Sequence, residues 1–472
     1  MSVFERNIGL FTDHYELTMA QGYFLSGKHH VRAVFDYFFR KNPYNGGFVI
    51  YTGLDDLLDI IDNYRFEEDD CQFLESIGFD KRFVKSLHEF RFQGNIYSVS
   101  EGEVVFPEEP VFRVEGGIIE SQILESVILN TLNFQSLIAT KASRMRLAAG
   151  DKLLLDFGMR RAQGLGAVHA SRAAMIGGFN GTSNVYSAHR FGFQSTGTMA
   201  HSWVQAFENE LEAFRTFALQ YPDSAVLLVD TYDTLNTGIP NAIKVAKELE
   251  DKGGKLVGIR LDSGDLAYLS RVARNMLNES GLQYVKIMVS NQLDEYVIRS
   301  LQEQHAPVDG FGVGTALVTG KGEGALDGVY KMSHVGRKST MKVSDNISKM
   351  TLPGIKNLFR FKNPDNGLFR ADGIELDNAG VPEIIYHPQR PEMNSKVKQF
   401  GYEDIIHKVM EGGKILVDRK SVSEIAENSQ NRLQHFPEEI KRFENPHIYK
   451  VGIGKELMNL RNSLKSRALS LK

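Results

Sequence analysis

"KLVGIRLDSGD", residues 255–265, joins a short apolar run to a polar turn, and segments of this kind recur through the middle of the chain. Between about residue 150 and residue 335 they alternate with helical stretches. From Asp230 to Gly314, consecutive runs are spaced close to the ~30 residues of one βα unit. This spacing predicts an α/β fold with parallel βα units in an irregular (β/α) barrel. The other runs are KLLLDFG (152–158), SAVLLVDTYD (224–233), VKIMVSN (285–291), VDGFGVGT (308–315) and LDGVYKM (326–332).

Each of these runs is followed by polar residues or glycine. The carboxyl ends of parallel strands meet at one edge of a sheet, so these groups should converge on one rim of the barrel. We therefore expect the chemistry at that rim. The rim candidates are Asp156, Asp230, Arg260, Asp262, Asn291, Gly312 and Gly314.

Three regions are expected along the chain. Residues 1–145 form an N-terminal α+β lobe with short aromatic-rich strands, and residues 146–345 form the α/β barrel. Residues 346–472 form a C-terminal segment that packs on the N-terminal lobe, so that the two ends build a second lobe. Apolar residues at mostly four-residue steps from Ile119 to Leu137 predict a long amphipathic helix that connects the first two regions.

The composition excludes several classes of protein. The chain has 472 residues, 42% of them hydrophobic, and a formal net charge of -4. It lacks the basic excess that binds a phosphate backbone, so a nucleic acid partner is not expected. A single cysteine, Cys71, excludes an intramolecular disulfide and favours a reducing compartment such as the cytoplasm. No segment approaches the roughly 18 apolar residues of a membrane span, so no membrane association is expected.

Residues 310–318, GFGVGTALV, read as a strand, a glycine-rich turn and the start of a helix. Amides near Gly314 and Thr315 can face an anion there, helped by the partial positive charge of a helix N-terminus. A phosphate would fit this turn. A tight βα turn that needs glycine for its backbone angles explains the same residues equally well.

Residues 258–266, GIRLDSGDL, place two opposite charges at a strand end. Arg260 and Asp262 alternate along the strand and therefore point the same way. Such a pair suits a phosphate next to a sugar diol. The alternative is an internal ion pair with a helix N-cap at Ser263 or Asp265, and both can hold at once.

Residues 153–164, LLLDFGMRRAQG, supply Phe157 as an aromatic face and Arg160 as a cation able to bind a carboxylate or phosphate in bidentate fashion. Together they could hold a flat anionic ring. A core phenylalanine and a solvated arginine are the alternative.

His201, in GTMAHSWV (197–204), stands at the start of a predicted helix. An isolated histidine there is more often structural than catalytic, but the nearby strand-end polar groups favour a functional role. Asp230 is a strand-end carboxylate of the kind that orients an imidazole ring.

Taken together, these segments resemble the nicotinate phosphoribosyltransferase family, within the group that includes nicotinamide and quinolinate phosphoribosyltransferases. The resemblance covers most of the chain and is weakest after residue 400. Its motifs, in order, are FTDHYELTMAQGYF (11–24), FDYFFRKNP (35–43), LLDFGMRRAQG (154–164), IGGFNGTSNV (176–185), GTMAHSWVQAF (197–207), LVDTYDTLNTG (228–238), GIRLDSGDL (258–266), GFGVGTALVT (310–319) and TLPGIKNLFRF (351–361).

The resemblance implies that the chain joins nicotinate to 5-phosphoribosyl 1-diphosphate, releasing pyrophosphate and forming nicotinate mononucleotide for NAD biosynthesis. It also implies ATP as a co-substrate, with hydrolysis coupled through a phosphohistidine as in an ATP-dependent ligase. His201 matches the residue that takes the γ-phosphoryl group, and Asp230 its acidic partner. Mg²⁺ should be carried by pyrophosphate and ATP, without a metal site of the protein itself.

The same resemblance assigns binding roles. Phe157 would stack on one face of the pyridine ring, and Tyr15 would cover the other face from the second subunit of a homodimer with shared active sites. Arg160 and Arg260 would neutralise phosphate or carboxylate oxygens, and Asp262 would hold the ribose hydroxyls. The turn at Gly314 and Thr315 would cradle the 5'-phosphate.

Base choice depends on Ser183. Nicotinamide-specific relatives carry an aspartate there to receive the amide, and a serine removes a charge that would repel a carboxylate. Nicotinate is favoured, with a nicotinamide phosphoribosyltransferase as the alternative. A catalytically silent barrel that binds a phosphorylated ligand is a third interpretation, and the histidine argues against it.

Overall fold

The computed structural model describes residues 8–343 and 350–470 and divides the chain into two compact units. Unit 1 combines residues 1–140 with residues 325–472, and unit 2 is residues 141–324. Both ends of the chain therefore belong to one unit. The segment from 325 to 345, which we placed with the barrel, groups with unit 1 instead.

Unit 1 is built on an antiparallel seven-stranded sheet. Its β1 strand, RAVFDYFF, is buried at every residue but the first, because it lies inside the sheet with packed layers on both faces. Phe35 on β1 stacks on Tyr330 of β12 with 4.9 Å between the ring centroids. The order is β13 (Lys338–Ser339), β12 (Gly328–Val335), β1 (Arg32–Phe39), β5 (Phe112–Gly117), β3 (Asn95–Val99), β19 (Ile406–Glu411) and β20 (Lys414–Ile415).

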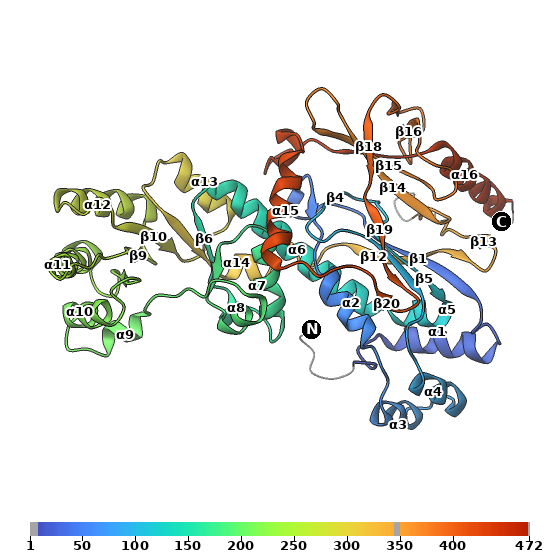
Figure 1. The fold of residues 1–472 in the computed structure, drawn as a ribbon, viewed down its shortest axis with the longest axis horizontal. Coiled ribbons are helices and arrows are strands. Elements are labelled where there is room, and N and C mark those ends of the chain that lie inside the picture. The colour runs from blue at the N-terminus through green and yellow to red at the C-terminus, as the bar shows by residue number, and fades with distance from the viewer. Residues whose placement is uncertain (1–7, 344–349, 471–472) are drawn as a thin grey trace. The chain divides into compact units, whose positions relative to one another are not determined.

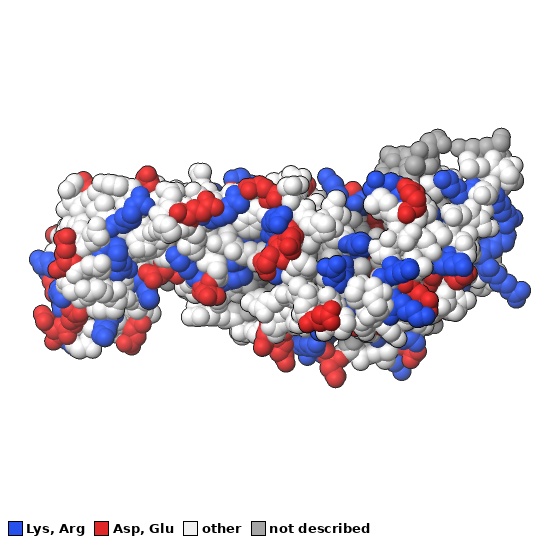
Figure 2. Space-filling view, turned by 90° about the horizontal axis from the view of Figure 1, so that it is seen from above, with Lys and Arg blue, Asp and Glu red and all other residues white. Residues whose placement is uncertain are grey.

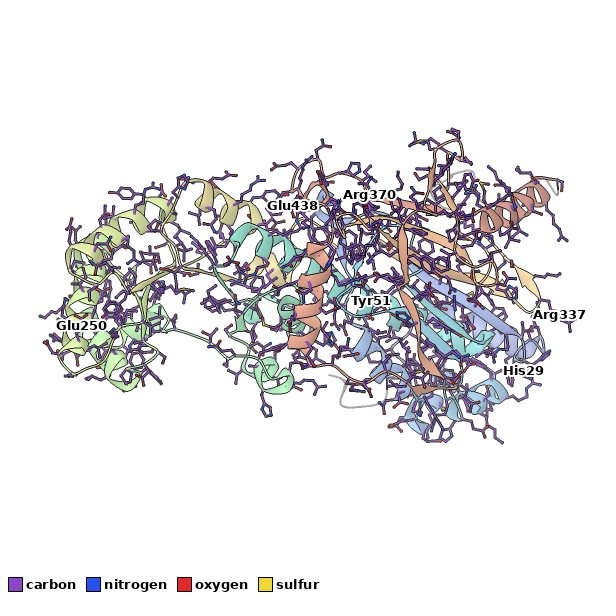
Figure 3. The ribbon with its side chains drawn as sticks, turned by 45° about the horizontal axis from the view of Figure 1, so that its top comes forward. His29, Tyr51, Glu250, Arg337, Arg370 and Glu438 are labelled. Atoms are coloured by element: carbon purple, nitrogen blue, oxygen red, sulfur yellow. The ribbon has the colours of Figure 1, made fainter. Side chains whose placement is uncertain are left out.

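Two further sheets complete unit 1. One has the order β17 (Asn394–Lys396), β16 (Ile384–Tyr386), β21 (Lys450–Ile453), β15 (Phe369–Leu376), β14 (Lys356–Lys362) and β18 (Gly401–Asp404). The other pairs β2 (Val49–Ile50) with β4 (Val104–Val105). Tyr51, labelled in Figure 3, follows β2 directly; it is 1% exposed, and its hydroxyl lies 2.9 Å from that of Ser98.

The helices of unit 1 begin at recognisable signals in the sequence. Asp80 caps α4 by accepting from the Arg82 amide, and Ser421 and Glu424 form a capping box at the start of α15. The helices are α1 (His14–Leu25), α2 (Leu54–Asp62), α3 (Glu68–Ser76), α4 (Lys81–His88), α5 (Ile118–Ile123), α15 (Val422–Gln434) and α16 (Lys455–Leu469), with the short turns η1 (Pro43–Asn45) and η5 (Glu438–Lys441).

Arg360 on β14 forms the centre of a buried ionic network in unit 1. Its guanidinium contacts Asp372 of β15 at 2.6 Å and Glu103 at 2.6 Å, and it is 0% exposed. Arg432 of α15 also contacts Glu103, at 2.8 Å. The network ties the N-terminal segment to the C-terminal one, which we had expected to pack together.

Two sequence expectations differ from the structure. The helix expected over 119–137 is divided between α5 and α6 (Glu125–Ala149), and α6 runs on to residue 149. The run 326–332 is a strand, but it is part of β12 and pairs with β1 in the antiparallel sheet, so it is not a barrel strand. An apolar run identifies a strand without identifying its partner.

Unit 2 holds a parallel six-stranded sheet. Its order is β7 (Gly181–Thr182), β6 (Leu153–Asp156), β11 (Gly310–Val313), β10 (Lys286–Ser290), β9 (Gly258–Leu261) and β8 (Val226–Leu228). Five of the predicted apolar runs supply five of these strands, and the mixed α/β class is confirmed. The strands β7 and β8 are the edges of this sheet, so closure into a barrel stays a prediction.

Helices follow the strands of unit 2 as expected for βα units. Asp265, one of the two predicted caps, accepts from the Tyr268 amide at the start of α12, and Asp294 caps α13. Helices α10, α11 and α12 lie side by side (Figure 1). The helices are α7 (Gly166–Ile176), α8 (Val185–Phe191), α9 (His201–Gln205), α10 (Glu210–Gln220), α11 (Ile239–Glu250), α12 (Leu266–Glu279), α13 (Glu295–Glu303) and α14 (Thr315–Val318), with the short turns η2 (Met159–Arg161) and η3 (Thr234–Gly238).

Candidate active site

The carboxyl ends of the unit 2 strands carry most of the predicted site residues. Phe157 follows β6, Asp230 follows β8, Asp262 follows β9, and Gly314 follows β11. Parallel pairing places these ends along one edge of the sheet, as the sequence predicted. On the outer surface, acidic and basic side chains are interspersed over much of the face in Figure 2.

Asp156, the last residue of β6, organises one end of this edge. Its carboxylate accepts hydrogen bonds from the Gly158 amide at 2.8 Å and from the Ser171 and Thr182 hydroxyls at 2.7 Å each. It is 0% exposed, and burial raises its pKa although these three donors lower it. Asp156 therefore serves to fix β6, β7 and α7 relative to one another.

His201 is the first residue of α9, and its ring lies against the end of β8. Its Nδ1 is 3.0 Å from the Thr231 hydroxyl, and its Nε2 is 4.0 Å from Asp230 Oδ1. The His201 side chain is 41% exposed, whereas that of Asp230 is only 1% exposed. The structure therefore brings the predicted pair together, with the ring accessible and the carboxylate buried behind it.

Asp230 is held by the turn that follows the neighbouring strand β9. Its Oδ2 accepts from the Asp262 amide at 2.9 Å and from the Ser263 hydroxyl at 2.6 Å. Among the residues that the structure describes, its buried Oδ1 has no hydrogen-bond partner. The orientation of the carboxylate is thus set by the turn after β9, with one oxygen left facing the His201 ring.

Arg260 connects three parts of the site. Its guanidinium donates to Ser290 at 2.8 Å, to Thr198 at 2.9 Å and to Asp262 at 2.9 Å. Ser290 also donates to Asp262. The internal ion pair that we considered for Arg260 and Asp262 is therefore present. Because Thr198 precedes His201 by three residues, the same network anchors the segment that carries the histidine.

Phe157 lies under the guanidinium of Arg260, whose central carbon is 5.2 Å from the ring centroid. The ring also packs against Gly312 on β11, where an added Cβ would lie 2.3 Å from it. Gly312 is thus glycine because the aromatic ring occupies the space of a side chain. An aromatic face stacked with a cation at a strand end suits a flat anionic ring.

The remaining predicted residues are exposed or half-buried. Arg160, in η2, and Thr315, the first residue of α14, are exposed, while Gly314 and Ser183 are half-buried. Ser183 is held through its backbone, whose amide donates to the Asp156 carbonyl at 2.8 Å. Tyr15 is in unit 1, on α1, with 49% of its surface exposed.

Three hydroxyl residues in this site were not among the predicted ones. Thr231 contacts the His201 ring, and Thr198 and Ser290 accept from Arg260. Thr231 directly follows Asp230, and Ser290 ends the apolar run of β10, so position alone could have indicated both.

No group of three or more His, Cys, Asp or Glu side chains is placed to hold a metal ion in residues 8–343 and 350–470. Within the same ranges, no helix has the length and the apolar character needed to cross a membrane. A cavity of about 760 Å³ in unit 1, lined by Arg40, Glu108 and Arg390 among others, includes none of the predicted site residues.

Comparison with known proteins agrees with this geometry. Residues 153–362 match the nicotinate phosphoribosyltransferase (NAPRTase) family, residues 10–133 its N-terminal domain, and residues 355–461 its C-terminal domain. Nicotinate phosphoribosyltransferase of Bacillus subtilis is 39% identical over 460 residues, which cover 95% of this chain and 94% of the relative. The chain belongs to the nicotinate phosphoribosyltransferase family.

Other members of the nicotinate phosphoribosyltransferase family are similar over nearly the whole chain. The Dictyostelium discoideum enzyme is 33% identical over 516 residues, covering 96% of this chain and 88% of the relative. The crystal structure of human nicotinic acid phosphoribosyltransferase superposes with a TM-score of 0.85 at 30% identity, covering 96% of this chain and 99% of the human one. The C-terminal segment, where the sequence resemblance was weakest, is included in the family match up to residue 461.

Proposed function

We propose that this chain is a nicotinate phosphoribosyltransferase. It joins nicotinate to 5-phosphoribosyl 1-diphosphate and releases nicotinate mononucleotide and pyrophosphate. Family membership supports the reaction, and the observation that supports the mechanism best is the His201 ring, which is accessible on one side and backed by the buried Asp230 carboxylate.

The pyridine nitrogen of nicotinate is already a nucleophile, so the reaction needs no general base. The task of the protein is to stabilise an oxocarbenium-like carbon and a departing pyrophosphate. Phe157 offers a stacking face for the pyridine ring, and Arg260, held over it, offers positive charge. Asp262 is 29% exposed and can accept from the ribose hydroxyls while it keeps its bond to Arg260.

The other assignments complete this proposal. Arg160 is exposed and free to approach a carboxylate or phosphate, and Gly314 with Thr315 form the turn for the 5'-phosphate. Mg²⁺ would be carried by ATP and by the diphosphate group that leaves as pyrophosphate, and would keep most of its waters. Tyr15 closes the pyridine site from the second subunit of a homodimer, for which its exposure on α1 leaves it available. The enzyme works in the cytoplasm.

ATP acts through His201 in this proposal. The γ-phosphoryl group is transferred to the ring, which places a new anion beside the pyrophosphate and Mg²⁺ and so favours the bound transition state over the substrates. Hydrolysis of the phosphohistidine then returns His201 to its unphosphorylated form. The protein is in this sense an ATP-dependent ligase.

A product assay tests the proposal. The protein is incubated with 5-phosphoribosyl 1-diphosphate, Mg²⁺ and either nicotinate or nicotinamide, with and without ATP, and the nucleotides are separated by chromatography. Nicotinate mononucleotide should form, and faster with ATP. Conversion of nicotinamide without conversion of nicotinate would show that the assignment is wrong.

Two variants and one control variant sharpen this assay. His201→Asn should abolish the acceleration by ATP and the acid-labile phosphate on the protein. His305→Asn is the matched control. His305 is exposed and precedes β11, so it lies at the amino ends of the strands, away from the predicted site. Its φ is +54°, which asparagine tolerates. Ser183→Asp should shift the preference toward nicotinamide, because the added carboxylate repels nicotinate and accepts from an amide.

A further inference from the structure

The cavity of about 760 Å³ in unit 1 has an excess of positive charge along its walls. Its lining includes five cationic side chains and one carboxylate, although the chain as a whole has a net charge of -4. The cations are Arg40, Arg390, Lys450, Arg461 and Lys465, and the carboxylate is Glu108. Burial raises the pKa of Glu108 to about 7, so near neutral pH this carboxyl group offsets less than one full charge.

Arg461, on α16, is a buried cation without an anionic partner. It is 8% exposed, and in the described parts of the chain its guanidinium donates only to neutral oxygens, those of the Pro388 carbonyl and the Asn462 side chain. Burying a cation is unfavourable unless an anion compensates it. Arg360, buried in the same unit, contacts two carboxylates. Arg461 therefore lacks the negative charge that a ligand would supply.

Other cations of the cavity are also available to a ligand. The side chains of Arg390 and Lys465 are exposed and have no hydrogen-bond or ion-pair partner among residues 8–343 and 350–470. Lys465 follows Arg461 by four residues on α16, so both lie on the same face of that helix. Arg461 also donates to Pro388, in the loop that carries Arg390. These three cations are thus neighbours at one wall of the cavity.

The loop between β16 and β17, which carries Arg390, is fixed by its own hydrogen bonds. The His387 amide donates to the Met393 carbonyl at 2.8 Å, and the Met393 amide donates to the Arg390 carbonyl at 2.8 Å. His387 Nδ1 accepts from the Gln389 and Arg390 amides at 3.1 and 3.2 Å. This wall of the cavity is therefore formed before any ligand binds.

Aromatic and apolar side chains form much of the remaining wall. Tyr449 stacks on Phe106 with 4.0 Å between the ring centroids, and its hydroxyl donates to the buried Asp372 at 2.9 Å. Tyr386 and Met393 also line the cavity. A cavity of several hundred Å³ with apolar walls and a few charged groups is typical of small-molecule sites, and aromatic walls suit a flat ring.

We propose that this cavity is a ligand site for a phosphorylated ring compound such as a nucleotide. Arg461, Arg390 and Lys465 bind the phosphate, and the ring lies against Tyr386 and Tyr449. Several cations favour a phosphate over a carboxylate, because a phosphate monoester carries about 1.5 to 2 negative charges at pH 7. The site uses none of the residues assigned to the transferase reaction, so this inference goes beyond the proposed function and does not depend on it.

Isothermal titration calorimetry on the full-length protein tests the proposal with AMP as the probe. Adenosine and inorganic phosphate represent the two halves of the ligand. We expect AMP to bind with a Kd below about 1 mM, and each half to bind at least about tenfold more weakly. The proposal is overturned if AMP does not bind, or if it binds no better than adenosine or phosphate.

A double variant, Arg390→Ser with Lys465→Ser, locates the binding site. Neither side chain has a partner to lose, so the variant should fold like the wild type, and its affinity for AMP should fall at least about tenfold. Arg370→Ser with Lys455→Ser is the matched control. Arg370 on β15, labelled in Figure 3, and Lys455 on α16 are exposed and do not line the cavity. The control should bind AMP within about twofold of the wild type.

Arg461→Met tests the buried cation. AMP should raise the Tm of the wild type, because it binds the folded chain, and should leave the Tm of Arg461→Met unchanged. A rise equal to that of the wild type would contradict the role of Arg461. If Arg461→Met does not fold, the double variant and its control still decide. AMP bound by the double variant with wild-type affinity would place the nucleotide elsewhere and overturn the proposal, while the transferase assignment would stand.

Discussion

Gly312→Ala tests whether the position of the Phe157 ring matters for catalysis. The new Cβ would lie 2.3 Å from Phe157 Cε2 and 2.5 Å from Cδ2, about 1 Å short of the ~3.5 Å of an ordinary carbon contact. Phe157 is only 8% exposed and has the Arg260 guanidinium over it, so the ring must move by about 1 Å toward the site.

The magnitude follows from this displacement. Overpacking of this kind lowers the free energy of unfolding by about 1–3 kcal/mol, which urea denaturation measures. A shift of ~1 Å in a group that orients substrate lowers the rate by up to about 100-fold, so we expect kcat/KM for nicotinate to fall between about 10-fold and 100-fold. Steady-state kinetics at saturating 5-phosphoribosyl 1-diphosphate measure the effect.

Gly254→Ala is the control, because Gly254 precedes β9 and so lies at the amino ends of the strands, away from the predicted site. An added Cβ at Gly254 would lie 3.6 Å from the nearest heavy atom, which is an ordinary contact. Gly254→Ala should change neither the free energy of unfolding nor kcat/KM for nicotinate. The reasoning is refuted if Gly312→Ala keeps kcat/KM within about twofold of the wild type while its stability falls, since the ring then moves without consequence.

Three further predictions concern buried charges. Asp156→Ala removes the acceptor of three donors and should lower the free energy of unfolding by about 3 kcal/mol, whereas the exposed Asp151→Ala should be neutral in the same urea titration. Arg360→Met leaves Asp372 buried without its cation, while Glu103 keeps Arg432, and should cost about 3–5 kcal/mol; a loss below ~1 kcal/mol would contradict the network. Burial raises the pKa of Glu16 from 4.5 to about 7, so the folded chain holds this proton more tightly and the free energy of unfolding falls as pH rises across that interval. Glu16→Gln should remove that part of the slope, as urea titrations at several pH values will show.

The sequence predicted the parts of the fold that are encoded locally. Short apolar runs ending in polar residues predicted the strands β6, β8, β9, β10 and β11, and with them the place of Asp230. The pairing of His201, which begins α9, with Asp230 was implied by the family resemblance. Asp265 was predicted as a helix cap from local sequence as well, because a short acidic side chain can accept from the first free amides of a helix.

Pairing over long distances was not predictable in this way. The segment of β12 contains an apolar run like those of the barrel strands, yet it pairs with β1, which lies almost 300 residues earlier. The contact of Thr198 with Arg260 was missed because a threonine hydroxyl is short and common in turns, and only the folded chain shows which one meets a guanidinium. Asp156 was singled out by its place at a strand end, but its three donors come from α7, β7 and the following turn.

The interrupted course of unit 1 has a consequence for biosynthesis. Residues 141–324 are continuous and emerge from the ribosome as a complete folding unit, while β1 has to wait for β12 and β3 for β19, which is made some 300 residues later. During that interval the first sheet has open edges that can pair with other chains. Nascent chains stalled before residue 406 should therefore need chaperones for their earliest segment, although it was synthesised first.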